Sequence, residues 1–318
     1  MSNININMNG VALGDSLKWN PVTNEWGVTQ IPYDTSVPDN EPNFVIALTG
    51  QSNSQGANSY YHASNKMDQP HERILGWNPT ANAWELADMN TESLGYSWCK
   101  PIGNQCFAFH FARRLVEAYP EIRVGIINFG LGGQPIARWA TYAEGEEYYA
   151  YNIQRVVDAN QLYPDFNFFQ GDIFYMHASI INNAFASLKF KKNIDVICYH
   201  QGEADGYGVD SAYYLNSLKK VIEQYRSLNS CCPTTPFIVG ETTGASLGVD
   251  VNWEERNVEL RNLNKDSDPY TKCVYCGDLE TSHGQYNNGD TIHYSANAQR
   301  KMGTLYFRSY RSIFDFDG

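Results

Sequence analysis

The chain has 318 residues, of which 42% are hydrophobic and only 18% charged, and its formal net charge is −12. This size and apolar content allow one large α/β domain or two small ones. The acidic balance, without any Lys/Arg cluster, argues against nucleic acid or an anionic membrane as a partner. We expect no signal peptide and no transmembrane helix, and hence a protein that is cytoplasmic when made, because the N-terminus is polar and the apolar runs are strand-sized.

Residues 1–41 differ in composition from the rest, and we expect them to form an extended N-terminal arm. The stretch from Gly10 to Trp26 resembles short β-units of bacteriophage tail fibres, so a place on a virion tail is one possible role. Within it, Gly14–Leu17 spells GDSL, the name of an esterase family. No buried strand precedes Ser16, and a nucleophile needs one, so we reject Ser16.

From residue 42 to 318 we expect one catalytic domain, because apolar strands alternate with amphipathic helices, as in a parallel sheet covered on both faces. The expected strands are 44–48, 123–128, 194–199, 236–240 and 272–278. The expected helices lie within 104–118, 173–188, 215–228 and 302–313. Two segments lack this alternation. Residues 57–103 are expected to form a wall of the site, and residues 139–170 a helix with a covering loop.

The candidate nucleophile is Ser52 in Phe44–Gly56, FVIALTGQSNSQG. A buried strand ends there at glycine and presents a serine at the carboxyl edge of the sheet, where open α/β sheets bind ligands. The alternative is an ordinary strand-to-loop turn of small polar residues. A serine needs a base and donors for the oxyanion before it can act as a nucleophile.

The C-terminal region supplies the candidate base. Asp290 and His293 are separated by two residues just before the last helix, so the carboxylate can hold the imidazole while its other nitrogen faces Ser52. The alternative is a loop in which the histidine is merely exposed. His283 competes with His293 but has no Asp three residues before it.

Two further polar stretches follow predicted strands. Gly130–Pro135, GLGGQP, is glycine-rich, which lets backbone N–H groups approach a reacting carbonyl. It lacks the lysine and the spacing of a phosphate-binding loop. His200–Asp205, HQGEAD, follows another strand and is expected at the same edge of the sheet.

These four blocks, in this order over residues 42–312, resemble the SGNH hydrolase superfamily and within it the sialate O-acetylesterase-like carbohydrate esterases. The resemblance implies a flavodoxin-like three-layer α/β/α sandwich with a five-stranded parallel sheet. It also implies metal-free hydrolysis of acetyl esters on sugars. By motif, Ser52 is the nucleophile, His293 the base and Asp290 its partner. The oxyanion hole would comprise Ser52, Gly133 and Gln201, the last in place of the more usual asparagine.

The same resemblance implies substrate-binding positions, listed here: Gln51, Asn53, Arg138, Trp139 and Glu203. Glu203 and Asp205 have a second interpretation, which is that they only brace loops by hydrogen bonds. The seven cysteines are expected to be mostly free thiols, and a zinc site at Cys273 and Cys276 is disfavoured because residues three apart in a strand face opposite sides. We expect no metal and no cofactor.

We therefore expect a serine esterase that removes O-acetyl groups from carbohydrate, with an O-acetylated glycan as its partner. Two alternatives remain. The first is a non-catalytic glycan-binding or tail structural module on the same fold. The second is a lipase or thioesterase, which would need an apolar acyl pocket, whereas residues 57–103 are polar and aromatic.

Overall fold

A seven-stranded sheet lies at the centre of the protein. The computed structural model describes residues 17–20, 25–28, 37–38, 41–206, 209–243 and 251–314. The sheet has the order β5-β4-β6-β3-β7-β8-β9, and every neighbouring pair is parallel except β5 with β4. Its strands are β3 (Phe44–Gly50), β4 (Ile74–Asn78), β5 (Ala83–Leu86), β6 (Val124–Gly130), β7 (Val196–His200), β8 (Phe237–Gly240) and β9 (Thr271–Val274).

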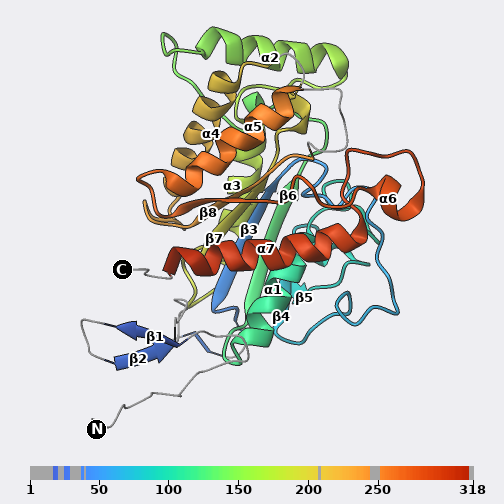
Figure 1. The fold of residues 1–318 in the computed structure, drawn as a ribbon, viewed down its shortest axis with the longest axis vertical. Helices are drawn as coiled ribbons and strands as arrows, with labels where there is room; N and C mark the ends of the chain where they lie inside the picture. The colour runs from blue at the N-terminus through green and yellow to red at the C-terminus, as the bar shows by residue number, and fades with distance from the viewer. Residues whose placement is uncertain are drawn as a thin grey trace.

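Helices cover both faces of this sheet and make three layers. Along β3, Phe44, Ile46 and Leu48 belong to one core cluster, while Val45 and Ala47 belong to the other. The first cluster includes residues of α1 and α7, which lie across the sheet in Figure 1, and the second includes residues of α3 and α4. The helices are α1 (Phe107–Ala118), α2 (Tyr149–Leu162), α3 (Asp172–Ala186), α4 (Ser211–Arg226), α5 (Val251–Asn262), α6 (Ser282–Tyr286) and α7 (Ala296–Phe314). Short 3-10 turns are η1 (Glu92–Leu94), η2 (Ile136–Arg138), η3 (Glu203–Asp205) and η4 (Leu263–Lys265).

The predicted three-layer α/β/α class is confirmed, but the predicted count of five strands is wrong. The five expected strands are all present, in the flavodoxin-type order β6-β3-β7-β8-β9. The hairpin β4–β5 adds two more strands beyond β6, and it comes from the segment 57–103, where no strand was expected. The four expected helices correspond to α1, α3, α4 and α7, and the segment 139–170 contains α2.

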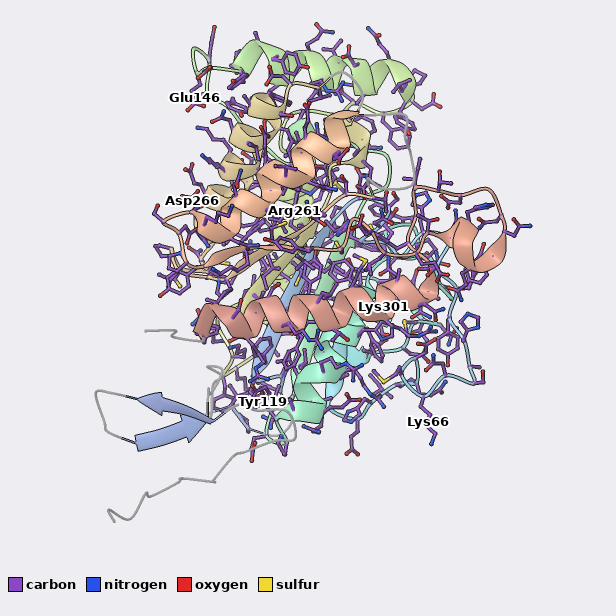
Figure 2. All side chains as sticks on the ribbon, viewed as in Figure 1. Lys66, Tyr119, Glu146, Arg261, Asp266 and Lys301 are labelled. Carbon is purple, nitrogen blue, oxygen red and sulfur yellow. The ribbon has the colours of Figure 1, made fainter. Side chains whose placement is uncertain are left out.

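The N-terminal residues that are described form a separate two-stranded antiparallel sheet, β1 (Leu17–Asn20) with β2 (Glu25–Val28). Ser16 lies outside the described residues. Charged side chains such as Lys66, Asp266 and Lys301 lie on the outside of the main body (Figure 2). Among the described residues, no helix combines the length and the apolar character that crossing a bilayer requires.

Candidate active site

Three strands end together where Ser52 begins its loop. The N–H of Gln51 donates to the carbonyl of His200 at the end of β7, at 2.9 Å, and the N–H of Leu131, after β6, donates to the carbonyl of Gly50, also at 2.9 Å. These bonds bring the loops after β3, β6 and β7 to one edge of the sheet, as predicted from the sequence. Ser52 is half-buried at this edge, while its neighbours Gln51 and Asn53 are buried.

Asp290 and His293 form a hydrogen-bonded pair. The Nδ1 atom of His293 lies 2.8 Å from Oδ2 of Asp290, and the backbone N–H groups of Ile292 and His293 both donate to the other carboxylate oxygen at 3.0 Å. The Asn58 side chain also donates to the carboxylate. Burial acts to raise the pKa of Asp290, but the bonds from Asn58 and His293 outweigh it and hold this pKa below its ordinary value. The aspartate is therefore ionised and keeps a proton on the Nδ1 side of the imidazole.

Asn53 joins the loop of Ser52 to the loop of His293. Its Nδ2 donates to the carbonyl of Ile292 at 3.2 Å, and its Oδ1 accepts from the N–H of Tyr294 at 3.0 Å. The residues on either side of His293 are thus fixed to the residue that follows Ser52, although some 240 positions separate them in the chain. Within the described residues, the Ser52 hydroxyl makes no hydrogen bond to the His293 ring, and such bonds are often long before substrate arrives.

The glycine loop after β6 packs directly against Ser52. A Cβ atom at Gly132 would lie 3.3 Å from the Ser52 Cβ and 2.7 Å from Oε1 of Gln55, so a side chain there would displace Gln55 and press on Ser52. Among the described residues, the backbone N–H groups of Ser52 and Gly133 have no hydrogen-bond acceptor. Two backbone donors beside one serine are what an oxyanion hole requires.

Gln201 is directed into the protein, and its contacts do not support the third donor role predicted for it. It is 0% exposed, and its Nε2 donates to Oδ2 of Asp205 at 2.6 Å and to the carbonyl of Gln134 at 3.1 Å. Both of these neighbours are acceptors, so both amide hydrogens are occupied. The Tyr199 hydroxyl donates to its Oε1. Gln201 therefore holds the glycine loop in place and has no hydrogen left for a substrate oxygen.

The residues expected to bind substrate are buried and bonded within the protein. Glu203 is the centre of this group, because its Oε2 accepts from Nε2 of Gln51 and its Oε1 from Nδ2 of Asn53, both at 2.6 Å. Burial acts to raise the pKa of Glu203, but His200 and Asn53 outweigh it and keep this pKa below the ordinary value. One carboxylate thus fixes both neighbours of Ser52, which agrees with the bracing interpretation of Glu203.

Arg138 and Trp139, which were also expected at the substrate, are covered as well. The Arg138 guanidinium pairs with Asp172 at 2.6 Å, and the Trp139 indole N–H donates to the Thr49 hydroxyl at 3.1 Å. Each side chain is at most 2% exposed. A long polar side chain in a motif can bond to a substrate or can hold a loop by bonding within the protein, and the sequence alone does not distinguish these two roles.

The structure also includes neighbours that the sequence interpretation missed. Asn58 bonds to Asp290, and Tyr163 places its hydroxyl 3.5 Å from the position that a Cβ at Gly133 would take. Neither residue has a motif or spacing that could have indicated its place. His283 accepts from the N–H of Gly289 and has no carboxylate partner in the part of the chain that is described. In the same described ranges, no group of three His, Cys, Asp or Glu side chains could hold a metal ion.

Comparison with known proteins adds a family and a fold. The family model described as "Carbohydrate esterase, sialic acid-specific acetylesterase" matches residues 42–312. No match was found among curated proteins. A protein of Arabidopsis thaliana is 18% identical, with a TM-score of 0.55, over 85% of this chain and 98% of its own. NanS is 16% identical, with a TM-score of 0.52, over 85% and 97%.

A third solved structure, XAC1771, is described as a novel carbohydrate acetylesterase from Xanthomonas citri. It is 16% identical, with a TM-score of 0.56, and the match covers 85% of this chain and 56% of that protein. At these identities the three structures share the fold with this chain.

Proposed function

The chain belongs to the sialic acid-specific acetylesterase family of carbohydrate esterases, and from this premise we propose that it removes acetyl groups from sugar hydroxyls by a Ser52–His293–Asp290 mechanism. The observation that carries the proposal is the attachment of the His293 loop to Asn53, next to Ser52, together with the 2.8 Å bond between His293 and Asp290. These contacts support a nucleophile, a base and its partner at one edge of the sheet.

In the first step, the Ser52 oxygen attacks the acetyl carbonyl carbon, and Nε2 of His293 takes the hydroxyl proton. Asp290 holds the opposite ring nitrogen and stabilises the imidazolium that forms. The carbonyl π bond breaks, and its electron pair moves to the oxygen, which becomes negatively charged. The N–H groups of Ser52 and Gly133 are the donors that we assign to this oxyanion.

In the second half of the reaction, His293 protonates the departing sugar hydroxyl, and the carbon–oxygen bond to the sugar breaks. Water then attacks the acetyl group on Ser52 with His293 again as the base. Collapse of this second tetrahedral intermediate releases acetate and restores the serine hydroxyl. One water molecule is consumed, and its proton passes through His293 to the serine oxygen, so the atoms and charges of these steps balance.

The test is a pair of serine substitutions assayed with p-nitrophenyl acetate. Ser52→Ala should abolish hydrolysis and also covalent labelling by a fluorophosphonate, while Ser16→Ala should keep both. Labelling that survives in Ser52→Ala would overturn the assignment of the nucleophile. An intact, folded protein that neither labels nor hydrolyses the ester would instead favour the glycan-binding module.

The choice of sugar is the second part of the proposal. Acetate release should be measured with a panel of O-acetylated polysaccharides and sialosides, because the family description names a sialic acid-specific activity. Cleavage of long-chain acyl or thioesters in preference to acetylated sugars would favour the lipase or thioesterase interpretation instead.

The N-terminal arm is proposed to be a separate unit that ends at residue 41. The family match beginning at residue 42 and the separate sheet β1–β2 support this boundary. The likeness of the arm to tail-fibre units leads us to propose attachment to a virion tail, where the esterase would act on a host surface polysaccharide. Analysis of the proteins in purified particles tests this, and particles that lack the polypeptide would contradict it.

A further inference from the structure

A loop with exposed aromatic rings lies beside the glycine loop of the candidate active site. This loop, residues 163–169, follows α2, at one end of the molecule in Figure 1. Three of its rings are open to solvent: Tyr163 is 40% exposed, Phe166 61% and Phe169 56%. Large apolar groups exposed together on a surface indicate a binding site rather than ordinary surface composition.

One of these rings, Phe166, ends a stack that starts inside the protein and passes through the half-buried Phe168. The guanidinium carbon of Arg138 lies 3.4 Å from the centre of the Phe168 ring, and the Phe166 ring is stacked on Phe168 with centroids 5.4 Å apart and planes inclined by 15°. Arg138 is itself buried and fixed by its ion pair with Asp172. A buried, charged residue therefore orients a ring whose neighbour is open to solvent.

The backbone of the loop is fixed as firmly as its rings. Asn160 on α2 accepts from the N–H of Phe168 at 2.7 Å and donates to the carbonyl of the same residue at 3.0 Å. Further along, the N–H of Gly171 donates to the carbonyl of Ala137 at 3.1 Å. A ligand that meets these rings does not have to order them, and this lowers the entropic cost of binding.

The loop also reaches the position where the ester would react. The Tyr163 hydroxyl lies 3.5 Å from where a Cβ of Gly133 would be, and it has no hydrogen-bond partner among the described residues. Asp165 and Asn167, between the rings, are exposed polar side chains. The surface thus combines flat apolar rings with hydrogen-bonding groups and is continuous with the candidate oxyanion hole.

We propose that Tyr163 and Phe166, the latter supported by Phe168 stacked between it and Arg138, form a platform for the sugar units next to the acetylated one, so that the enzyme acts preferentially on oligomeric or polymeric glycan. The apolar C–H faces of pyranose rings pack on aromatic rings, while sugar hydroxyls bond to Tyr163 and to the polar groups between the rings. The proposal rests on the proposed function, because it extends the same substrate beyond its acetyl group. The Tyr163 hydroxyl beside Gly133 favours a sugar over a second copy of the chain as the occupant, because a sugar offers hydroxyl groups to bond to it.

The experiment compares Phe166→Ala with Phe190→Ala, a control in which a phenylalanine of similar exposure, 51%, is removed from the opposite end of the sheet near Glu41. Both are assayed with p-nitrophenyl acetate, with an acetylated monosaccharide and with longer acetylated oligosaccharides of that sugar. Phe166→Ala should raise KM for the oligosaccharides by about tenfold, the effect of losing one aromatic packing partner. It should leave kcat/KM for the two small esters unchanged, and Phe190→Ala should match the wild type throughout.

An equal loss on p-nitrophenyl acetate and on oligosaccharides would overturn the platform, since it indicates damage to the site itself. An unchanged KM for oligosaccharides, or a dimer of the wild type that dissociates in Phe166→Ala, would overturn it as well. Binding of deacetylated oligosaccharides to Ser52→Ala that weakens about tenfold when Phe166→Ala is added supports the platform without any turnover. This readout separates the two proposals, because it can succeed even if the wild type releases no acetate.

Discussion

Replacing Glu203 by glutamine changes one atom at the centre of the buried network beside Ser52. In the wild type, both carboxylate oxygens accept hydrogen bonds of 2.6 Å, one from Gln51 and one from Asn53. His200 Nε2 lies 3.5 Å from Oε1. Each carboxylate oxygen accepts from a side-chain amide, so the NH2 of glutamine would face the NH2 of Gln51 or of Asn53 whichever way it points.

The loss of stability expected for Glu203→Gln follows from the number of hydrogen bonds to the carboxylate and from their burial. A hydrogen bond to a charged group contributes about 1.5–3 kcal/mol, and a buried donor left without an acceptor costs about 1–3 kcal/mol. Losing one such bond and weakening the other should lower the free energy of unfolding at neutral pH by about 2–4 kcal/mol. Because Gln51 and Asn53 flank Ser52, kcat should fall by about 10²-fold, as expected for a misplacement of the nucleophile by about 1 Å.

The pH dependence gives an independent check. Although burial opposes it, the bonds from His200 and Asn53 lower the pKa of Glu203 in the folded protein below its ordinary value of 4.5. A carboxyl with a lowered folded pKa adds stability above its unfolded pKa and loses it as the pH falls through the folded pKa. As the pH falls below 4.5, the free energy of unfolding of the wild type should therefore fall faster than that of Glu203→Gln. The difference in unfolding free energy between the two proteins should narrow.

Urea unfolding at neutral pH and at a series of acidic values measures this difference, with p-nitrophenyl acetate turnover recorded alongside. The control is Glu146→Gln, whose exposed carboxylate pairs with Lys220 and which is labelled at the surface in Figure 2. It should keep wild-type stability and kcat. A Glu203→Gln variant as stable and active as the wild type at neutral pH would refute the reasoning, as would a stability difference that stays constant into acid.

Three further outcomes are expected. Asn58→Ala removes a bond that lowers the pKa of Asp290, so the acidic limb of the kcat/KM profile should move to higher pH; an unmoved limb would separate Asn58 from the site. Gly132→Ala places a methyl 2.7 Å from Gln55 and 3.3 Å from Ser52 and should lower kcat about tenfold. Gly145→Ala meets nothing within 4 Å but stands at a φ of +89°, so it should cost some stability and leave kcat unchanged; an equal fall in kcat for the two alanines would contradict the steric argument. Cys232, the exposed thiol, has a pKa lowered by nearby threonine hydroxyls and should react first with a thiol reagent; a fast phase that persists in Cys232→Ser would argue against this.

The sequence predicted the five central strands because each is a short apolar run, buried on both faces of the sheet. It did not predict β4 (Ile74–Asn78), and the reason is visible in Gly76. A Cβ there would lie 1.8 Å from the carbonyl oxygen of Ser93, so the strand must contain a glycine, and glycine weakens the strand pattern. Tertiary packing, absent from any local pattern, determines this residue. The helix α5 was missed for a related reason, since its sequence VNWEERNVELRN has no clear apolar stripe.

The residues of the candidate site could be picked out from the sequence, but which of them bond to the protein rather than face a substrate could not. Ser52, Asp290 and His293 could be picked out because each stands at the end of an expected strand or before the last helix. The polar residues around them read in sequence as contacts for a substrate. Their burial assigns them to the protein interior instead, and burial at this level depends on how distant loops meet, which a single sequence does not record.

The buried contacts of Gln51 and Asn53 suggest why an amide side chain stands on each side of Ser52. A serine at the end of a strand is held by its own chain on one side only, whereas His293, its proposed base, lies on a loop some 240 residues away. Gln51 is bonded through Glu203 to the loop after β7, and Asn53 is bonded to Glu203 and also to the residues flanking His293. Three loops are thereby linked by hydrogen bonds that water cannot easily replace. Ser52 is left half-buried between two fixed neighbours. Under the proposed mechanism, the folded protein therefore sets the position of Ser52 relative to His293 before any substrate binds.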